Sequence, residues 1–293
     1  MLALLLGASI LGAGLVIDMA LDDDDDANND ADQGTDTGTG NEENGELIDV
    51  ALSGNGAEFF GSDLSERIMG TNGADSVDGG AGNDILNGLV GGDILLPGAG
   101  DDTVYGGGGN DQIGTSEGDD RLFGEDGDDL IADEDGVANS GNDFMRGGDG
   151  NDILISDDGF DELRGDLGND LLFAVDADLA EASPDLLVGG FGDDLLAGDE
   201  GDTLTGGEGT DTFAVIYPSN DAGPAIITDF DPTSETLTLE ADNQFGTDPV
   251  VDIAATDDGT GSIITVDGVE FVVVQNTTPD QLVQGLNFAL SGV

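Results

Sequence analysis

Gly79-Gly80-Ala81-Gly82-Asn83-Asp84-Ile85-Leu86-Asn87 is the clearest copy of a nine-residue pattern that decides the fold. The pattern reads G-G-x-G-x-D-x-U-x, where U is a large apolar residue, and it recurs from residue 70 to residue 214. Copies begin at residues 70, 79, 88, 97, 106, 115, 124, 138, 147, 156, 165, 180, 189, 198 and 206, and a degenerate copy at 61–69 precedes them. A fixed period of this kind predicts a repeat architecture.

The sixth position is Asp in all fifteen copies, and the eighth position is apolar. The copy at residue 198 lacks one residue, so Asp202 and Leu204 are aligned by allowing a gap. Glycine suits a backbone that needs positive φ or a close approach to an ion, and x-U-x suits a short strand with one inward side chain. Two half-turns make a coil of eighteen residues, which stacks every second Asp above another at roughly 5 Å.

The stacked carboxylates predict a bound cation. Two carboxylates roughly 5 Å apart repel by about 0.8 kcal/mol even at the dielectric constant of water, so a long stack needs positive charge between its turns. The chain has no His and no Cys, which leaves carboxylate and carbonyl oxygens as ligands. Oxygen ligands in a flexible loop favour Ca²⁺ over Zn²⁺ and copper, and over Mg²⁺, which demands strict octahedral geometry.

At these residues the chain resembles the RTX, or haemolysin-type, calcium-binding repeat family. The resemblance covers about half of the chain. It implies an all-β fold, a parallel β-roll (β-solenoid), with Ca²⁺ held between successive turns by carbonyls of the Gly-rich segment and by the sixth-position Asp. The implied metal ligands are Asp75, Asp84, Asp93, Asp102, Asp111, Asp120, Asp129, Asp143, Asp152, Asp161, Asp170, Asp194, Asp202 and Asp211, with Gly80, Gly82, Gly107, Gly109, Gly148, Gly150, Gly190 and Gly192.

Two acidic residues at ladder positions are left out of this ligand set. Asp185 follows Ser183 and Pro184 in place of turn residues, so it fits a solvated loop as well as it fits a ligand. Glu66, in the degenerate copy, fits a structural role better. If one site needs two successive turns on the same side, the roll holds about nine Ca²⁺ ions, or about thirteen if coils also stack across two insertions at 133–137 and 174–179.

Composition limits the partners. The net charge is −62, with four arginines and no lysine, so nothing is available to neutralise the phosphates of a nucleic acid. The absence of Cys removes disulfides and thiolate metal sites. Without metal, so acidic a chain is predicted to be disordered. The four arginines and two tyrosines show no clustered pattern in the sequence.

The sequence divides into five segments. Residues 1–21 are apolar and without Lys or Arg; they fit a membrane anchor or uncleaved signal, a cleaved signal, or a buried or artefactual start. Residues 22–46 form an acidic linker that is predicted to be disordered. Residues 47–69 are predicted to be an N-terminal cap, 70–214 the calcium-binding roll, and 215–293 a C-terminal β domain.

Five strands are predicted beyond the repeats, at 225–227, 236–239, 250–251, 262–266 and 270–274. Asp267-Gly268 predicts a hairpin turn, and Thr278-Pro279 predicts the start of a short helix. This region resembles the β-sandwich cap that follows the roll in RTX proteins, including serralysins. That resemblance implies a C-terminal signal for type I secretion, although Asn287 stands where an acidic residue is common.

These features favour a non-enzymatic calcium-binding protein, secreted or on the cell surface of a bacterium, whose roll folds on binding several Ca²⁺ ions. One alternative is a calcium-dependent adhesin or matrix protein that bridges anionic cell-surface polysaccharide. Another is an RTX-type polysaccharide-modifying enzyme, since paired acids can hydrolyse glycosides. The zinc protease motif of serralysins, H-E-x-x-H, is impossible without His. The chain is therefore predicted not to be an enzyme.

Overall fold

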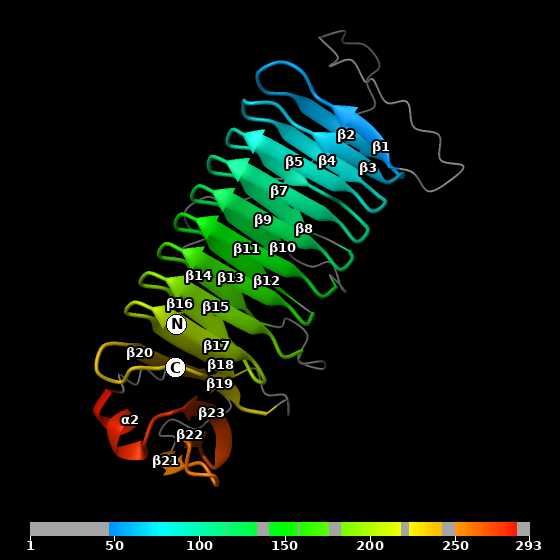
Figure 1. Ribbon diagram of the computed structural model, residues 1–293. Helices are drawn as coiled ribbons and strands as arrows, with labels where there is room; N and C mark the ends of the chain where they lie inside the picture. The colour runs from blue at the N-terminus through cyan, green and yellow to red at the C-terminus, as the bar shows by residue number, and fades with distance from the viewer. Residues whose placement is uncertain are drawn as a thin grey trace.

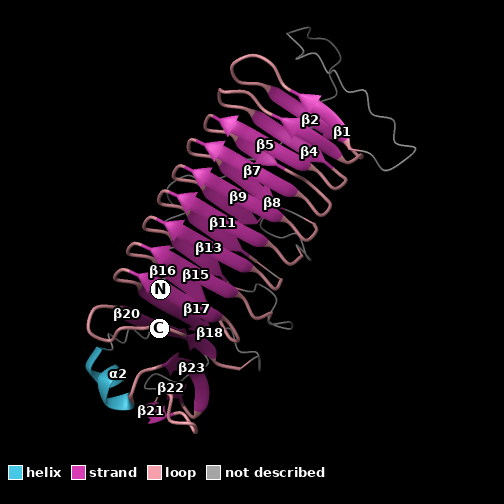
Figure 2. Cartoon of the chain, viewed as in Figure 1, coloured by secondary structure: helices cyan, strands magenta, loops and turns pink. Residues whose placement is uncertain are grey.

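The computed structural model describes residues 47–115, 117–133, 141–157, 159–175, 183–217, 223–241 and 250–285. Over these residues the chain winds into a straight stack of coils, in which successive strands from β1 to β20 alternate between two long sheets (Figure 1). The described elements are strands except for one helix near the C-terminal end (Figure 2). The predicted anchor at 1–21 and linker at 22–46 lie outside the described residues. In the part of the chain that the structure describes, no helix is long and apolar enough to cross a membrane.

Two sheets make up the described fold. Sheet A contains, in spatial order, β1 (Ile48–Ala51), β3 (Glu66–Met69), β5 (Ile85–Val90), β7 (Thr103–Gly108), β9 (Arg121–Asp126), β11 (Phe144–Asp149), β13 (Glu162–Leu167), β15 (Leu186–Phe191), β17 (Thr203–Glu208), β19 (Ala225–Ile227), β23 (Val269–Gln275), β22 (Gly261–Val266) and β21 (Val251–Ala255). Sheet B contains β2 (Glu58–Ser62), β4 (Ser76–Gly80), β6 (Ile94–Leu96), β8 (Gln112–Thr115), β10 (Leu130–Asp133), β12 (Ile153–Ser156), β14 (Leu171–Ala174), β16 (Leu195–Gly198), β18 (Thr212–Tyr217) and β20 (Thr236–Ala241).

The eighth-position side chains form the core. Within each sheet a strand pairs in parallel with the strand one coil further on, so that Leu86 pairs with Val104 and Val104 with Leu122. These three side chains are fully buried, as are their counterparts from the other sheet. The parallel β-roll implied by the family resemblance is therefore confirmed, with one large apolar side chain per repeat turned inward.

Both insertions are absorbed without breaking the stack. Leu122 pairs with Met145, 23 residues further on, and Leu163 pairs with Leu187, 24 residues further on. Across the shortened copy, Leu187 pairs with Leu204 at a separation of 17 residues, which confirms the gap assumed in the alignment. The insertions at 133–137 and 174–179 begin at the last residues of β10 and β14, so both fall between a strand of sheet B and the next strand of sheet A.

The roll extends beyond the boundaries predicted from the sequence, at both of its ends. Strands β1, β2 and β3 pair in parallel with the following coils, so residues 48–69 form the first coil of the roll. At the other end β18 pairs in parallel with β20, and β17 with β19, which adds a coil beyond residue 214. The coil forms without the glycine pattern because inward apolar side chains such as Leu237 and Ile227 continue the same core.

The C-terminal strands are built onto sheet A. β23 pairs in parallel with β19, and β22 and β21 follow as antiparallel strands. The predicted hairpin turn at Asp267-Gly268 is present, with φ of +50° and +85°. The predicted helix is α2 (Pro279–Gly285), where the N–H of Thr278 donates to Gln281 Oε1 at 3.0 Å. The strands and helix expected in this region are thus found, but they extend the roll's sheet.

Candidate calcium sites

The sixth-position aspartates form two ladders, one along each edge of the roll. Edge 1, which precedes the strands of sheet B, carries Asp75, Asp93, Asp111, Asp129, Asp152, Asp170, Asp194 and Asp211. Edge 2, which precedes the strands of sheet A, carries Glu66 and then Asp84, Asp102, Asp120, Asp143, Asp161, Asp185 and Asp202. Along a ladder each backbone N–H donates to the carboxylate one coil further on, as from Asp93 to Asp111 Oδ1 at 2.7 Å.

All fifteen aspartates are buried, with at most 5% of any one exposed. Asp185 belongs with them: it is 3% exposed, and its Oδ1 accepts the N–H of Asp161 at 2.8 Å. It therefore lies in the ladder and not in a solvated loop, because the parallel pairing of β13 with β15 continues past the insertion. Glu66 is also buried, and its carboxylate accepts the hydroxyl of Ser62 at 2.5 Å, in keeping with a structural role.

The glycines expected near the ions occupy conformations that residues with a Cβ rarely adopt. Each of the eight has positive φ, namely Gly80, Gly82, Gly107, Gly109, Gly148, Gly150, Gly190 and Gly192. At Gly150 φ is +149°, and a Cβ there would lie 2.5 Å from the carbonyl carbon of Gly127. The fourth position is thus glycine both for its φ and because the turn one coil before comes into contact.

The first-position glycines leave room for facing oxygen atoms. A Cβ on Gly106 would lie 2.5 Å from Asp111 Oδ2 and 2.8 Å from the carbonyl oxygen of Gly124, one coil further on. At Gly70 the same two distances are 2.7 Å to Asp75 Oδ2 and 2.6 Å to the carbonyl oxygen of Gly88. A carboxylate oxygen of one turn and a carbonyl oxygen of the next turn therefore converge on one small space.

Most of these carboxylate oxygens are buried without a hydrogen-bond donor. Within the described residues, Oδ2 has no partner in Asp84, Asp93, Asp102, Asp111, Asp129, Asp152, Asp170, Asp194 and Asp211. A buried anion without a partner is strongly destabilising, and native proteins rarely keep one unless an ion or water completes it. The same unpartnered Oδ2 recurs in nine turns, so it is a regular property of the roll.

Electrostatics agree with this geometry. The pKa of Asp84, Asp102, Asp111, Asp152 and Asp170 is raised to about 7, mainly by burial and also by neighbouring carboxylates, while the backbone N–H that donates to each carboxylate opposes the rise. A dication between turns stabilises the ionised form. Within the described residues no three acidic side chains form a metal-binding cluster. The first-position carbonyl oxygens face the same space as the carboxylates, as Gly124 O does at Gly106. This donor set, hard oxygens in a glycine turn, fits Ca²⁺.

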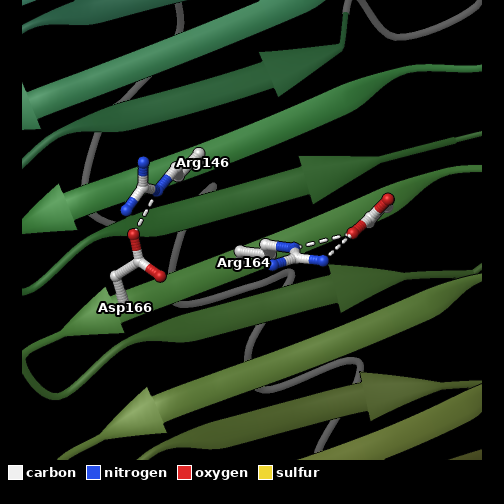
Figure 3. A network of polar contacts seen from close by, with 4 residues as sticks. Arg146, Arg164 and Asp166 are labelled. Atoms are coloured by element: carbon white, nitrogen blue, oxygen red, sulfur yellow. Dashed lines mark hydrogen bonds and ion pairs between the residues drawn. The ribbon is translucent and has the colours of Figure 1, made fainter.

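The structure also brings together basic and aromatic residues that lie apart in the sequence. On the outer face of sheet A, Arg121 and Arg164 each place Cζ 5.9 Å from the centroid of the Phe144 ring. Arg146 forms an ion pair with Asp166 beside them, and Arg164 pairs with Glu162 (Figure 3). The repeat pattern could have predicted this cluster. Arg121, Arg146 and Arg164 lie in alternate copies and next to the inward apolar residue, which places them on the same face of the same sheet.

Solved structures that match this chain include two proteins with low sequence identity. The solution structure of the AlgE6R3 subunit from the Azotobacter vinelandii mannuronan C5-epimerase shares 21% identity, covers 65% of this chain and 80% of its own, and gives a TM-score of 0.23. The crystal structure of the extracellular lipase LipA from Serratia marcescens shares 17% identity over 83% of this chain, with a TM-score of 0.25. The chain spans 42% of that lipase. A search of curated proteins found no match.

Comparison with family models gives the assignment. The model of the RTX calcium-binding nonapeptide repeat, which holds four copies, matches residues 60–95, 98–122, 115–136, 137–174 and 180–213. These ranges cover half of the chain and coincide with the two ladders. The chain is a member of the RTX calcium-binding nonapeptide repeat family, and its β-roll binds calcium.

Proposed function

We propose that the protein is a non-enzymatic calcium-binding protein, secreted or on the cell surface of a bacterium, whose roll folds when calcium is present. The observation that carries this proposal is the pair of ladders, in which nine buried carboxylate oxygens lack a donor among the described residues. Extracellular calcium modules bind with affinities of about 10⁻⁴–10⁻³ M, a range that leaves them empty in a calcium-poor cytoplasm and filled outside the cell.

The energetics of one repeat support a metal-dependent fold. Burying one large apolar side chain contributes about 2 kcal/mol, whereas ordering nine residues costs about 1 kcal/mol or more for each residue. Apolar burial therefore does not offset the entropic cost of ordering a repeat. Repulsion between the stacked carboxylates increases this deficit when no cation is present. Calcium bound between turns removes the repulsion and adds contacts, so its binding free energy becomes folding free energy.

The experiment is small-angle scattering of the full chain in chelator and in 5 mM Ca²⁺, with circular dichroism on the same samples. The ten parallel strands of each sheet from β1 to β20 predict a rod about 45 Å long in calcium. In chelator we expect an extended chain without β-sheet signal. A compact roll that persists in chelator refutes the calcium dependence of folding. Uptake of no calcium at all, measured by calorimetry, refutes the binding function.

A second candidate function, the bridging of acidic polysaccharide, is favoured by the arginine face of sheet A. All four arginines of the chain lie on strands of sheet A. Tyr105 and Phe123 stack at 5.1 Å beside them, and a groove of about 820 Å³ runs along the same strands, lined in part by Phe123, Arg146 and Phe191. Arginine pairs with carboxylates through two hydrogen bonds, and flat rings offer contact area to a sugar ring.

Glycan binding is tested separately from calcium binding. Binding of polygalacturonate and of a neutral glucan is measured on the calcium-loaded chain, with Arg121→Gln and Phe144→Ala as variants. Tighter binding of the acidic polymer that both variants weaken, at an unchanged calcium content, supports this function. Binding that is absent, or that the variants leave unaltered, rejects it and leaves the calcium-dependent fold standing.

A further inference from the structure

The turns of the roll are of two kinds, which the hydrogen bonds of the sixth-position Asp distinguish. In what we term open turns, Asp Oδ2 has no donor among the described residues; these begin at residues 79, 88, 97, 106, 124, 147, 165, 189 and 206. In closed turns the protein supplies a donor to Oδ2. The N–H of Thr71 donates to Asp75 Oδ2 at 2.6 Å, and the N–H of Asp199 donates to Asp202 Oδ2 at 2.6 Å.

Backbone conformation separates the same two groups of turns. The second residue of every open turn has positive φ: Gly80, Leu89, Gly98, Gly107, Glu125, Gly148, Asp166, Gly190 and Gly207. Thr71 and Asp199, at the second position of closed turns, do not. Because φ at this residue sets the plane of the preceding peptide, reversing it turns the N–H away from the carboxylate. A positive φ and a partnerless Oδ2 therefore have one cause, the orientation of this peptide.

Three open turns keep positive φ without glycine. Leu89, Glu125 and Asp166 adopt φ of 78°, 76° and 75°. For a residue with a Cβ this conformation is unfavourable, and such strain persists where the surroundings impose it, often at ligand sites. Neighbouring open turns impose it here, because the first-position carbonyl of each points back to the turn one coil before, as Gly124 O does toward Gly106.

A hydroxyl group closes the third closed turn. Ser156 stands at the first position where an open turn has glycine, and its hydroxyl donates to Asp161 Oδ2. Asp157 at the second position lacks positive φ, as expected for a closed turn. A donor from the chain thus satisfies the same carboxylate oxygen that a cation would contact in an open turn.

The two kinds of turn are distributed unevenly between the edges. Edge 1 has seven successive open turns, from residue 88 to residue 211, preceded by the closed turn of Thr71. Among the turns of edge 2 that the structure describes in full, those at 79 and 97 are open, and those of Ser156 and Asp199 are closed. Both insertions fall in connections from a strand of sheet B to a strand of sheet A, which belong to edge 2.

We infer that calcium is held only between successive open turns, so that one edge of the roll carries a row of six ions and the other edge carries a single ion. Each such site combines Asp Oδ2 of one open turn with the first-position carbonyl oxygen of the next. Edge 1 is then the metal-dependent edge, and the closed turns of Ser156 and Asp199 on edge 2 are held by hydrogen bonds within the chain. This inference rests on the proposed calcium binding and assigns it to particular turns.

Two reciprocal substitutions test the assignment. Thr71→Gly gives the closed turn at residue 70 the sequence of an open turn, beside an open turn whose Gly88 carbonyl oxygen already points toward Gly70. We expect it to add one ion. Gly207→Thr converts the last open turn to the sequence pattern of the turn at residue 70 and should remove one ion. Asp202→Asn, in a closed turn, serves as a charge-matched control for Asp194→Asn, in an open turn.

The readout is the number of calcium ions on the full chain by native mass spectrometry, checked by calorimetry, with circular dichroism to establish folding. Seven ions are expected in the natural sequence, eight in Thr71→Gly, six in Gly207→Thr, seven in Asp202→Asn and fewer than seven in Asp194→Asn. Ten or more ions in the natural sequence, or an unchanged number in folded Thr71→Gly, overturns the assignment while the calcium-binding function stands. Failure to bind any calcium overturns the proposed function itself.

Discussion

Replacing Asp111 by Asn, in the middle of the longest series of open turns, should have effects of opposite sign with and without calcium. Asp111 Oδ1 accepts the N–H of Asp93 at 2.7 Å, and an amide oxygen preserves that hydrogen bond. Oδ2, which is buried and without a donor among the described residues, loses its charge. The substitution therefore removes a calcium ligand while leaving the ladder of backbone hydrogen bonds in place.

The magnitudes follow from mass action and from the spacing of the coils. At 10 mM Ca²⁺ an ion with a dissociation constant of 10⁻⁴–10⁻³ M stabilises the fold by about 1.4–2.7 kcal/mol, which Asp111→Asn should forfeit. Without calcium the same change removes repulsion with Asp93 and Asp129, each about 4.8 Å away along the stack. At the dielectric constant of water this relief amounts to about 2 kcal/mol, so the metal-free roll should become more stable.

The assay is urea unfolding of the full chain, followed by circular dichroism at 10 mM Ca²⁺ and in chelator with a stabilising osmolyte. Asp128→Asn is the matched control, because it removes the same charge from an exposed fifth position. Hydrogen bonds from Asn151 hold the pKa of Asp128 below its usual value, and its Oδ1 accepts the N–H of Asn151 at 2.8 Å. We expect the control to change stability by about 0.5 kcal/mol or less. Equal losses in the two variants, or a loss for Asp111→Asn in chelator as well, would refute the reasoning.

Three further predictions concern pH, turns and core. The pKa of Asp102 is raised to about 7, mainly by burial. Because this folded-state pKa lies above the unfolded-state pKa, the metal-free roll gains stability as the pH falls from 7 toward 4. Protons then compete with calcium for the ladder carboxylates. The calcium midpoint by circular dichroism should therefore be higher at pH 6 than at pH 8, and an unchanged midpoint would contradict this. Gly150→Ala should abolish ordered stacking, because the added Cβ would overlap the backbone of the previous coil. The control Gly54→Ala, at φ +123° with no atom within 4 Å of the added Cβ, should lower stability by about 1–2 kcal/mol. Equal melting temperatures for the two variants would exclude overlap with the previous coil as the cause. Leu122→Ala, fully buried, should cost about 2–5 kcal/mol in chemical unfolding with calcium present, against less than about 1 kcal/mol for Val90→Ala, which is 55% exposed.

The repeat pattern by itself determined the fold and the positions of the carboxylates. Asp and an apolar residue two positions later stay in phase, and parallel coils preserve that phase, so Leu86 and Leu122 point inward and Asp84 and Asp102 stack. The hairpin at Asp267-Gly268 and the helix at Pro279 were equally local, because each depends on the conformations of two or three adjacent residues.

Contacts one coil away decided the rest. Whether the turn of Asp185 joins the ladder depends on strand pairing 24 residues away, which overrides the missing glycines. Asp161 and Asp152 hold the same position in the repeat, so the sequence period does not distinguish them. The hydroxyl of Ser156 donates to Asp161 Oδ2, whereas Asp152 Oδ2 has no donor among the described residues. A sequence period fixes which residues recur, but the donor that satisfies a buried carboxylate is set by the peptide orientation and the neighbouring turn in three dimensions.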